Sequence, residues 1–371
     1  MPAPISGRRS DQCCIREIPN ARTGEDAAGG DAGQSKSTLP VWSRPLKLSA
    51  FTIVDAFPPG TDPARDRHEE VVRLASHADR FAWNGFWVAE HHFHPGGTCP
   101  SAPVLLAACG QRTERIRLGS MVSVLAFHDP IRLAEQYALL DRMVQGRVNL
   151  GLGSGYIPVE FEGFGIDPST KRERFDRSLA LFLSALKGEE IAREGASSTG
   201  VRLNIRPIQQ PHPPVWIAVQ RREALPFVAQ KGLSVALIPY ATVAGLDELA
   251  EQIREFRRHV PAGGRAEVAV AVHLYAGPHV AEAHASLQKY LDGRLTTQST
   301  FYQQKVQHDP RHASAETIEQ SGLALIGSPP EVRKGLEAYR AIGVDEILGI
   351  LDFGGLRFEY VQETVESLGA Q

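Results

Sequence analysis

The chain has 371 residues, of which 42% are hydrophobic and 22% are charged, and its formal net charge is −3 at pH 7. This length and apolar content allow one large domain with a sizeable core. The lack of a basic excess argues against a nucleic-acid-binding protein, and no apolar run approaches the ~20 residues of a membrane span.

The cysteines carry no sign of a disulfide framework. Cys13 and Cys14 are adjacent, an awkward geometry for a mutual disulfide, and neither Cys99 nor Cys109 completes a Cys-x-x-Cys pair. We expect four free thiols in a reducing compartment. Because residues 1–10 lack the apolar stretch of a secretory signal, the cytoplasm is the expected location.

Residues 1–45 differ in composition from the rest of the chain. Gly, Ala, Ser, Asp, Gln and Arg dominate there, without apolar periodicity. Such a segment cannot bury enough surface to offset its ordering entropy. We expect a disordered N-terminal arm followed by a single domain over residues 46–371. An overextended start site and an untypical targeting segment are alternative explanations of the arm.

From residue 48 onward, short apolar runs alternate with amphipathic stretches of helical spacing. Strands are expected at residues 48–54, 86–89, 116–125, 148–152, 215–219, 235–238, 268–274 and 347–351. Helices are expected around residues 71–78 and at 102–110, 131–144, 172–187, 223–230, 246–259, 280–291 and 360–368. Ser328 is expected to cap a further helix that begins at Pro329 and that Gly343 ends. About eight strand–helix units favour an α/β fold, a (β/α)₈ TIM barrel.

Two long stretches interrupt this alternation, at residues 188–214 and 293–327. Loops of such length are uncommon unless they are functional. We expect both to be inserts over the barrel mouth, and residues 293–327 to be a substrate lid.

The strongest local signal is the cluster of Glu90, His91, His92 and His94 after the second strand. The carboxyl ends of the strands form the active site of such a barrel. A histidine with a pKa near neutrality can act there as a general acid or base. Each imidazole could instead merely bond to barrel carboxylates, but three at one strand end favour at least one functional histidine.

Two further strand ends are candidates for cofactor contacts. Residues 151–155 are glycine-rich but lack the full dinucleotide fingerprint, so a close approach to a planar ring or phosphate and a plain tight turn both remain open. Arg221 and Arg222 stand where a strand ends and a helix begins, a natural phosphate site. A solvated pair of surface arginines fits these two residues equally well.

Several stretches, in their order and spacing, resemble the luciferase-like monooxygenase family, at residues 86–93, 115–120, 128–135, 140–143, 146–147, 151–156, 160–165, 213–216 and 327–332. The resemblance covers residues 48–368. It implies a bacterial-luciferase-like TIM barrel, usually a homodimer, that binds reduced FMN or, in sister branches, the deazaflavin F420. FMN-type members use O₂ to oxygenate a small organic substrate, with reduced flavin supplied by a separate flavin reductase.

The same resemblance assigns roles to individual residues. It makes His91 the catalytic imidazole, and the adjacent Glu90 is the second expected catalytic residue. It implies a cis peptide bond between Met121 and Val122. The residues that it and the strand ends place at the cofactor are Ser120, Met121, Val122, Gly153, Ser154, Gly155, Tyr156, Arg221 and Arg222.

Three positions depart from the luciferase α chain. That chain has a reactive cysteine where Gly153 stands, so no thiol assists here. Its phosphate-binding arginine aligns with Ser154, and its phosphate-side serine aligns with Arg221. We hypothesise that Arg221 or Arg222 supplies the charge lost at Ser154.

The expected substrate pocket contains Phe57, Phe93, Phe127 and His128, which together with Tyr156 favour an apolar or aliphatic compound. A plain core role for the aromatic residues is equally compatible. No metal is expected, and FMN versus F420 remains open.

Two other functions compete with a flavin-dependent monooxygenase. A metal-dependent amidohydrolase-like barrel would use His92, His94 and Asp352, but His273 lies within a strand and His212 in a loop, which leaves its ligand set incomplete. A non-catalytic flavin-binding relative would bind flavin without turnover, and the presence of His91 argues against it.

Overall fold

The computed structural model describes residues 45–56, 66–94, 96–191, 200–296 and 300–369. The expected disordered arm, apart from Pro45, lies outside the described residues, as do Phe57, Cys13 and Cys14. Cys99 and Cys109 are buried free thiols, and burial raises the pKa of each to about 12. No helix among the described residues is long and apolar enough to cross a membrane.

The strands form one parallel sheet that closes on itself, because β10 pairs with both β1 and β8. Eight strands build the barrel, and β4 and β9 are short additions that pair with β5 and with the second half of β8. The strands are β1 (Lys47–Thr52), β2 (Gly85–Val88), β3 (Arg117–Ser120), β4 (Ser123–Val124), β5 (Val148–Gly153), β6 (Val215–Val219), β7 (Ser234–Leu237), β8 (Val268–Ala276), β9 (Ala324–Gly327) and β10 (Glu346–Ile350). The predicted TIM barrel and its eight strands are confirmed.

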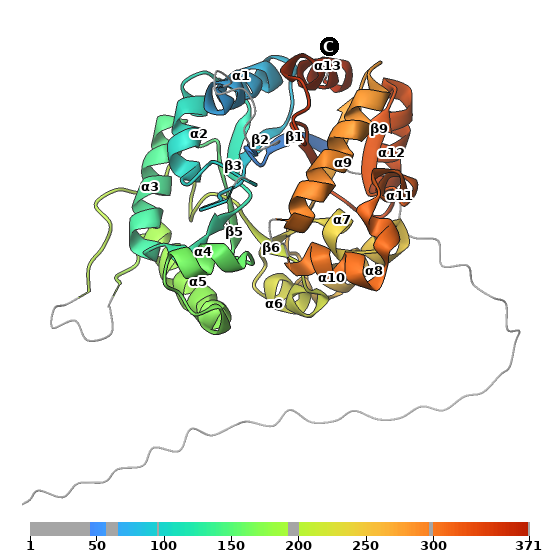
Figure 1. The fold of residues 1–371 in the computed structure, drawn as a ribbon. Coiled ribbons are helices and arrows are strands. Elements are labelled where there is room, and N and C mark those ends of the chain that lie inside the picture. Colours follow the sequence, from blue (N-terminus) through green and yellow to red (C-terminus); the bar gives the residue numbers. More distant parts are fainter. Residues whose placement is uncertain (1–44, 57–65, 95, 192–199, 297–299, 370–371) are drawn as a thin grey trace, which may run out of the picture. The chain divides into compact units, whose positions relative to one another are not determined.

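Helices surround this barrel (Figure 1). They are α1 (Arg67–Arg80), α2 (Ala102–Gly110), α3 (Pro130–Met143), α4 (Pro158–Gly163), α5 (Lys171–Lys187), α6 (Leu225–Gln230), α7 (Pro239–Thr242), α8 (Leu246–His259), α9 (Val280–Thr296), α10 (Thr300–His308), α11 (Ala315–Gln320), α12 (Pro329–Ala341) and α13 (Phe358–Leu368). Because strand and helix alternate, each helix returns the chain to the amino end of the next strand, and the site forms at the carboxyl ends.

Local capping explains where several helices begin. Asp129 accepts hydrogen bonds from the backbone N–H groups of Ile131 and Arg132 at the start of α3. At α12, Glu331 accepts from the backbone N–H and the hydroxyl of Ser328. Gly343 follows that helix with a φ of +95°, as the sequence predicts for a helix end.

The two long stretches lie at opposite ends of the barrel, which corrects one prediction. In residues 188–214, Gln209 donates to the backbone oxygen of Val148 and accepts from Arg117, the first residues of β5 and β3. The described part of this stretch, residues 188–191 and 200–214, therefore lies at the amino ends of the strands, away from the mouth, because it joins a helix to the strand that follows it.

The described residues of the second stretch, 293–296 and 300–327, form elements of their own rather than a plain loop. They contain the end of α9, then α10, α11 and β9. Lys305 of α10 donates to the backbone oxygen of Tyr240 at 2.7 Å, and the ring of Tyr302 packs against Tyr240. This stretch thus adjoins α7, which follows β7 at the carboxyl end of the barrel.

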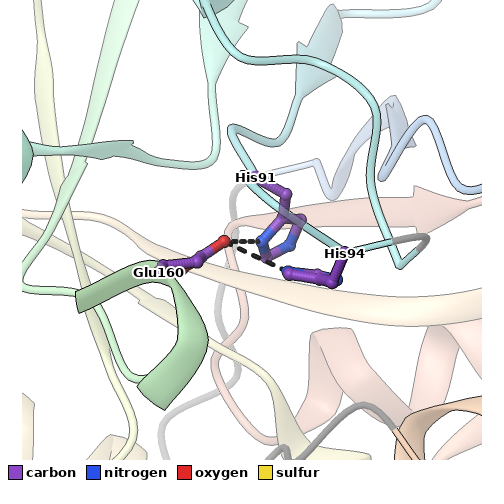
Figure 2. A group of neighbouring side chains, drawn as sticks. All are labelled: His91, His94 and Glu160. Atoms are coloured by element: carbon purple, nitrogen blue, oxygen red, sulfur yellow. Dashed lines mark hydrogen bonds and ion pairs between the residues drawn. The ribbon is translucent and has the colours of Figure 1, made fainter. Parts of the chain in front are cut away.

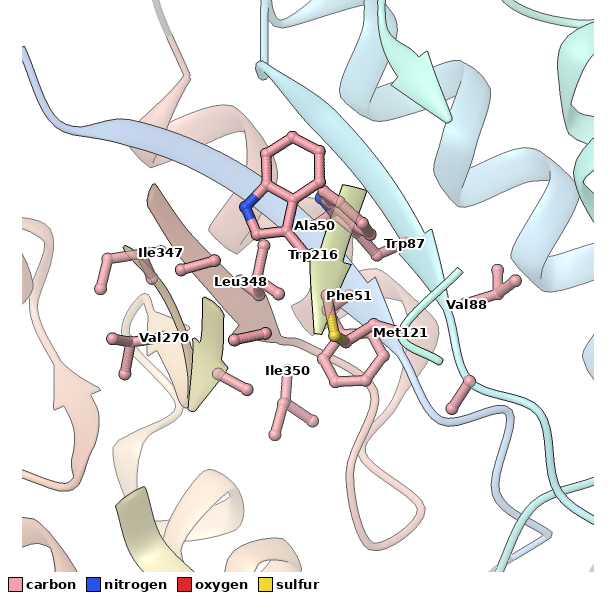
Figure 3. Packing of buried hydrophobic residues seen from close by; sticks show 14 of the residues in the cluster. Ala50, Phe51, Trp87, Val88, Met121, Trp216, Val270, Ile347, Leu348 and Ile350 are labelled. Atoms are coloured by element: carbon pink, nitrogen blue, oxygen red, sulfur yellow. The ribbon is translucent and has the colours of Figure 1, made fainter. Parts of the chain in front are cut away.

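The barrel interior is filled by large apolar side chains (Figure 3). The rings of Trp87 and Trp216 meet edge to face with centroids 5.3 Å apart, and both side chains are buried. A Cβ atom on Gly119 would lie 2.3 Å from the Trp87 ring, so the glycine makes room for it. This packing forms a solid floor beneath the mouth.

Candidate active site

A cavity of about 400 Å³ opens at the carboxyl ends of the barrel strands. This volume is within the range of roughly 300–1,000 Å³ that small-molecule sites occupy. The expected site residues that line it are Glu90, His91, Met121, Val122, Gly153, Ser154, Gly155, Tyr156 and Arg221. The predicted cis peptide bond between Met121 and Val122 is confirmed.

Two expected cofactor residues lie outside the cavity lining. Ser120 is fully buried and donates to the backbone oxygen of Gly151 at 2.8 Å. Arg222 turns toward α8, where its guanidinium pairs with Glu251 and Glu255 at 3.5 and 3.8 Å. Of the two candidate arginines, only Arg221 faces the cavity.

The expected substrate residues Phe93, Phe127 and His128 also lie outside the lining. Phe93 is 59% exposed, and both Phe93 and Phe127 pack against the ring of Phe164 with centroids 5.0 Å away. His128 bonds to Glu90 instead of facing the cavity. Phe93 and Phe127 thus form an aromatic cluster with Phe164, the residue that follows α4, and this cluster is not part of the cavity lining.

Glu160, at the centre of α4, organises the histidine cluster (Figure 2). Its Oε1 lies 3.0 Å from Nδ1 of His91 and 3.2 Å from Nε2 of His94. It also accepts from the backbone N–H of His92 at 3.0 Å. Sequence reasoning placed this residue only within a family-like stretch and gave it no role.

The hydrogen bonds fix the proton positions on these imidazoles. Nδ1 of His94 accepts from the backbone N–H of Gly96, so Nε2 of His94 carries the proton that it donates to Glu160. His91 donates from Nδ1 to the same carboxylate, which leaves Nε2 as the ring nitrogen available to a molecule in the cavity.

Electrostatics keep this pair as a carboxylate and a neutral imidazole. Burial would raise the pKa of Glu160, but hydrogen bonds from His91 and His94 outweigh it and lower that pKa to about 2. Burial lowers the pKa of His91 more than the contact with Glu160 raises it, and the charge of Arg294 adds to the lowering. Nε2 of His91 therefore carries a lone pair at neutral pH and can accept a proton.

Glu90 connects two of the loops that form the site. Its Oε1 contacts Nε2 of His128 at 2.9 Å and Nε2 of His92 at 3.2 Å, and it accepts from the backbone N–H of Val124. Burial would raise the pKa of Glu90, but the contacts with the two histidines lower it. The carboxylate thus ties the loop after β2 to the loop after β4.

Ligand atoms of His91, His94 and Glu160 all lie within 4.8 Å of one another, a donor set that could hold a metal ion. Asp352, the carboxylate that the amidohydrolase alternative requires, accepts hydrogen bonds from Thr52 and Arg67 instead. The particular ligand set of that alternative, with His92 and His94, is therefore not what the fold brings together.

Positively charged side chains also line the cavity, and Lys171 and Arg221 are called the rim below. Lys171, the first residue of α5, lines the cavity together with Arg172 and Arg221. Burial and the charge of Arg221 lower the pKa of Lys171, which places the two cations close to each other. Beside them, Gly155 has a φ of +78°, and a Cβ atom there would lie 3.0 Å from the Phe161 ring.

Sequence reasoning missed several residues that the fold brings to the cavity. They are Glu160, Lys171, Arg172, Tyr240, Tyr290 and Arg294. Glu160 stands in a family-like stretch and Tyr240 two residues after a predicted strand, but the others have no such signal.

The low pKa of Glu160 predicts a pH-dependent contribution to stability. Between its folded value of about 2 and its ordinary value of 4.5, the unfolded chain binds more protons, so the free energy of unfolding falls as the pH falls through this window. In the variant Glu160→Gln this contribution, on the order of 3 kcal/mol, should be absent. Urea unfolding at successive pH values measures it.

The difference in unfolding free energy between wild type and Glu160→Gln should be largest above pH 4.5 and should narrow toward pH 2. Glu162→Gln, which changes an exposed carboxyl group on the same helix, is the control and should follow the wild type. A difference that stays constant across this range would contradict the assignment.

Comparison with known proteins identifies the family to which this barrel is similar. The model of the luciferase-like monooxygenase family matches residues 47–346. The chain is 35% identical to the uncharacterized protein y4wF of Sinorhizobium fredii over 54% of this chain and 58% of that protein, so it spans little more than half of that relative. It is 24% identical to the oxygenase component of flavin-dependent trigonelline monooxygenase of Acinetobacter baylyi, over 81% of this chain and 88% of that one.

Two solved structures show the same fold. The oxygenating constituent of 3,6-diketocamphane monooxygenase from Pseudomonas putida, in complex with FMN, has a TM-score of 0.72 at 18% identity over 88% of this chain and 97% of that chain. The coenzyme F420 dependent tetrahydromethanopterin reductase from Methanopyrus kandleri has a TM-score of 0.64 at 15% identity over 87% and 97%. Since the family model spans nearly all of the barrel, the chain belongs to the luciferase-like monooxygenase family.

Proposed function

We propose that this chain is the oxygenase of a two-component system, which uses reduced FMN and O₂ to oxygenate a small organic substrate. The observation that carries the proposal is one cavity that combines apolar walls, a neutral imidazole held by a buried carboxylate, and a positively charged rim. Monooxygenases among the relatives favour this reading over the F420-dependent oxidoreductase, which remains the second candidate because F420 enzymes share the fold.

The walls suit a planar ring. Apolar side chains of Phe51, Ile53, Met121, Val122 and Ile350 line the cavity, and the backbone of β5 comes close to them. A Cβ atom on Gly153 would lie 2.6 Å from Val122, so any side chain there would push that wall inward. Reduced FMN, when bound, would supply the chemistry that activates O₂. The walls exclude water from it.

The rim suits the FMN phosphate. Lys171 and Arg221 provide two positive charges at the edge of the cavity, where a phosphate can stay partly hydrated. Arg221 thus takes over the charge lost at Ser154, with Lys171 as its partner, while Arg222 is committed to α8.

His91 would serve as the acid–base residue. Glu160 orients the ring through Nδ1, so that Nε2 can accept a proton and return it. The carboxylate stabilises the charged imidazole, whereas burial and Arg294 favour the neutral one. Because these effects on the pKa of His91 oppose each other, the imidazole can both accept a proton and release it.

We propose that reduced flavin comes from a separate reductase, by analogy with the relative named as an oxygenase component. The stretch of residues 293–327 is proposed to cover the mouth, since α10 holds Tyr240 of the cavity wall. The cytoplasmic location stays a prediction from the sequence.

We also propose a homodimer formed through α2 and α3. Val104 on α2 and Leu139 and Met143 on α3 are 69%, 51% and 45% exposed, although the two helices pack side by side. An exposed apolar patch of this kind favours association. Light scattering should give twice the chain mass for the wild type and the monomer mass for Leu139→Glu. A wild-type monomer would contradict the proposal.

The assignment of the phosphate site predicts how single substitutions change cofactor binding. Arg221→Ala and Lys171→Ala should each weaken FMN binding about 10-fold or more, because each removes a charge-assisted contact. Riboflavin lacks the phosphate, so its affinity should not change. Fluorescence titration measures both, with Arg222→Ala as the matched control. Unchanged FMN affinity in both cavity-facing variants would contradict the site.

The role of His91 predicts a loss of turnover without a loss of cofactor. With reduced FMN, O₂ and a panel of small apolar compounds with and without a carboxylate, His91→Gln should lower kcat by about 100-fold or more. Its FMN affinity should stay near the wild-type value, and the exposed-residue variant His308→Gln should behave as wild type. Wild-type protein that binds FMN but oxygenates nothing would support the non-catalytic alternative.

A further inference from the structure

Arg294 is a further positive side chain in the cavity lining, and unlike Lys171 and Arg221 it is buried. We propose that Arg294 binds an anionic oxygen of the substrate, so that the preferred substrates are small molecules with an apolar body and one carboxylate. This inference rests on the proposed function, because it names the substrate class for the same cavity.

The position of Arg294 follows from the fold. It stands in the last turn of α9, is 3% exposed, and lines the cavity. Its Nη2 donates to the hydroxyl of Tyr156 at 2.5 Å, which connects α9 to the loop after β5. A Cβ atom on Gly96 would lie 2.9 Å from Nδ1 of His94 and 3.5 Å from Nη1 of Arg294. The guanidinium therefore sits beside the His91–His94–Glu160 group.

The surroundings keep this region positive. Burial would lower the pKa of Arg294, but the hydroxyl groups of Tyr156, Tyr290 and Tyr240 raise it well above its ordinary value. Behind the tyrosines, burial and the charge of Arg294 lower the pKa of His273 to about 3, so that imidazole is neutral. Arg294 is thus a permanent charge in a poorly solvated wall.

One oxygen of the nearby carboxylate is engaged by the histidine cluster. Oε1 of Glu160 accepts from His91, from His94 and from the backbone N–H of His92.

Arg294 differs from Lys171 and Arg221 in its exposure to water. Arg221 is exposed and Lys171 is half-buried, so the rim meets water, whereas Arg294 is enclosed. A charge-assisted contact is stronger where water is excluded, and guanidinium geometry matches a carboxylate. A substrate carboxylate bound there would hold the apolar body within the cavity that His91 also lines, close enough to Arg294 for its charge to affect the imidazole.

The test uses two probes of the same shape, cyclohexanecarboxylate and cyclohexanecarboxamide, titrated calorimetrically into the full chain with FMN present. Wild type should bind the carboxylate at least 10-fold more tightly than the amide. Arg294→Gln should lose this preference and keep its affinity for the amide, and Arg294→Lys should retain part of the preference. Arg222→Gln, outside the cavity, should match the wild type.

Equal affinity of the wild type for both probes, or no binding of the carboxylate, would overturn the inference. A preference that persists in Arg294→Gln would overturn it as well. If Arg294→Gln does not fold, the wild type and Arg294→Lys decide, since an unchanged preference in the lysine variant with its shorter, single-point charge argues against guanidinium recognition. FMN affinity is measured separately, so absent flavin binding counts against the proposed function and leaves the carboxylate result to stand alone.

Discussion

Glu160 accepts three hydrogen bonds at one carboxylate oxygen, from two imidazoles and one backbone N–H, and the geometry of the barrel mouth depends on these contacts. They hold α4 against the loop after β2 and fix the tautomers of His91 and His94. They also decide the chemistry. With Nδ1 of His91 committed to the carboxylate, Nε2 is the atom left to exchange a proton with a bound molecule.

Charge is distributed unevenly around this centre. Lys171 and Arg221 are accessible to water, whereas Arg294 lines the same cavity but is buried. In the proposed function, a phosphate-bearing cofactor meets Lys171 and Arg221, and an anionic substrate meets Arg294. His91 lines the same cavity, and burial together with the charge of Arg294 lowers its pKa.

The sequence could predict the barrel because its information is local: strand and helix periodicity, and capping at residues such as Ser328. It could predict a histidine cluster at the mouth because a strand end in a parallel barrel faces the mouth, and the family resemblance singled out His91. It could not predict Glu160 as the partner of His91, since the two are 69 positions apart and α4 is only a short helix. Adjacent residues also diverge: Arg221 faces the cavity, but Arg222 begins a helical turn and pairs with α8.

The proposed function depends on which cofactor binds in the cavity. An anaerobic titration of the full chain with reduced FMN and with reduced F420 measures this. We expect saturable binding of FMN and clearly weaker binding of F420, because Lys171 and Arg221 offer two positive charges to a terminal phosphate beside the apolar lining of the cavity. Tighter binding of F420, or no binding of FMN, would contradict it.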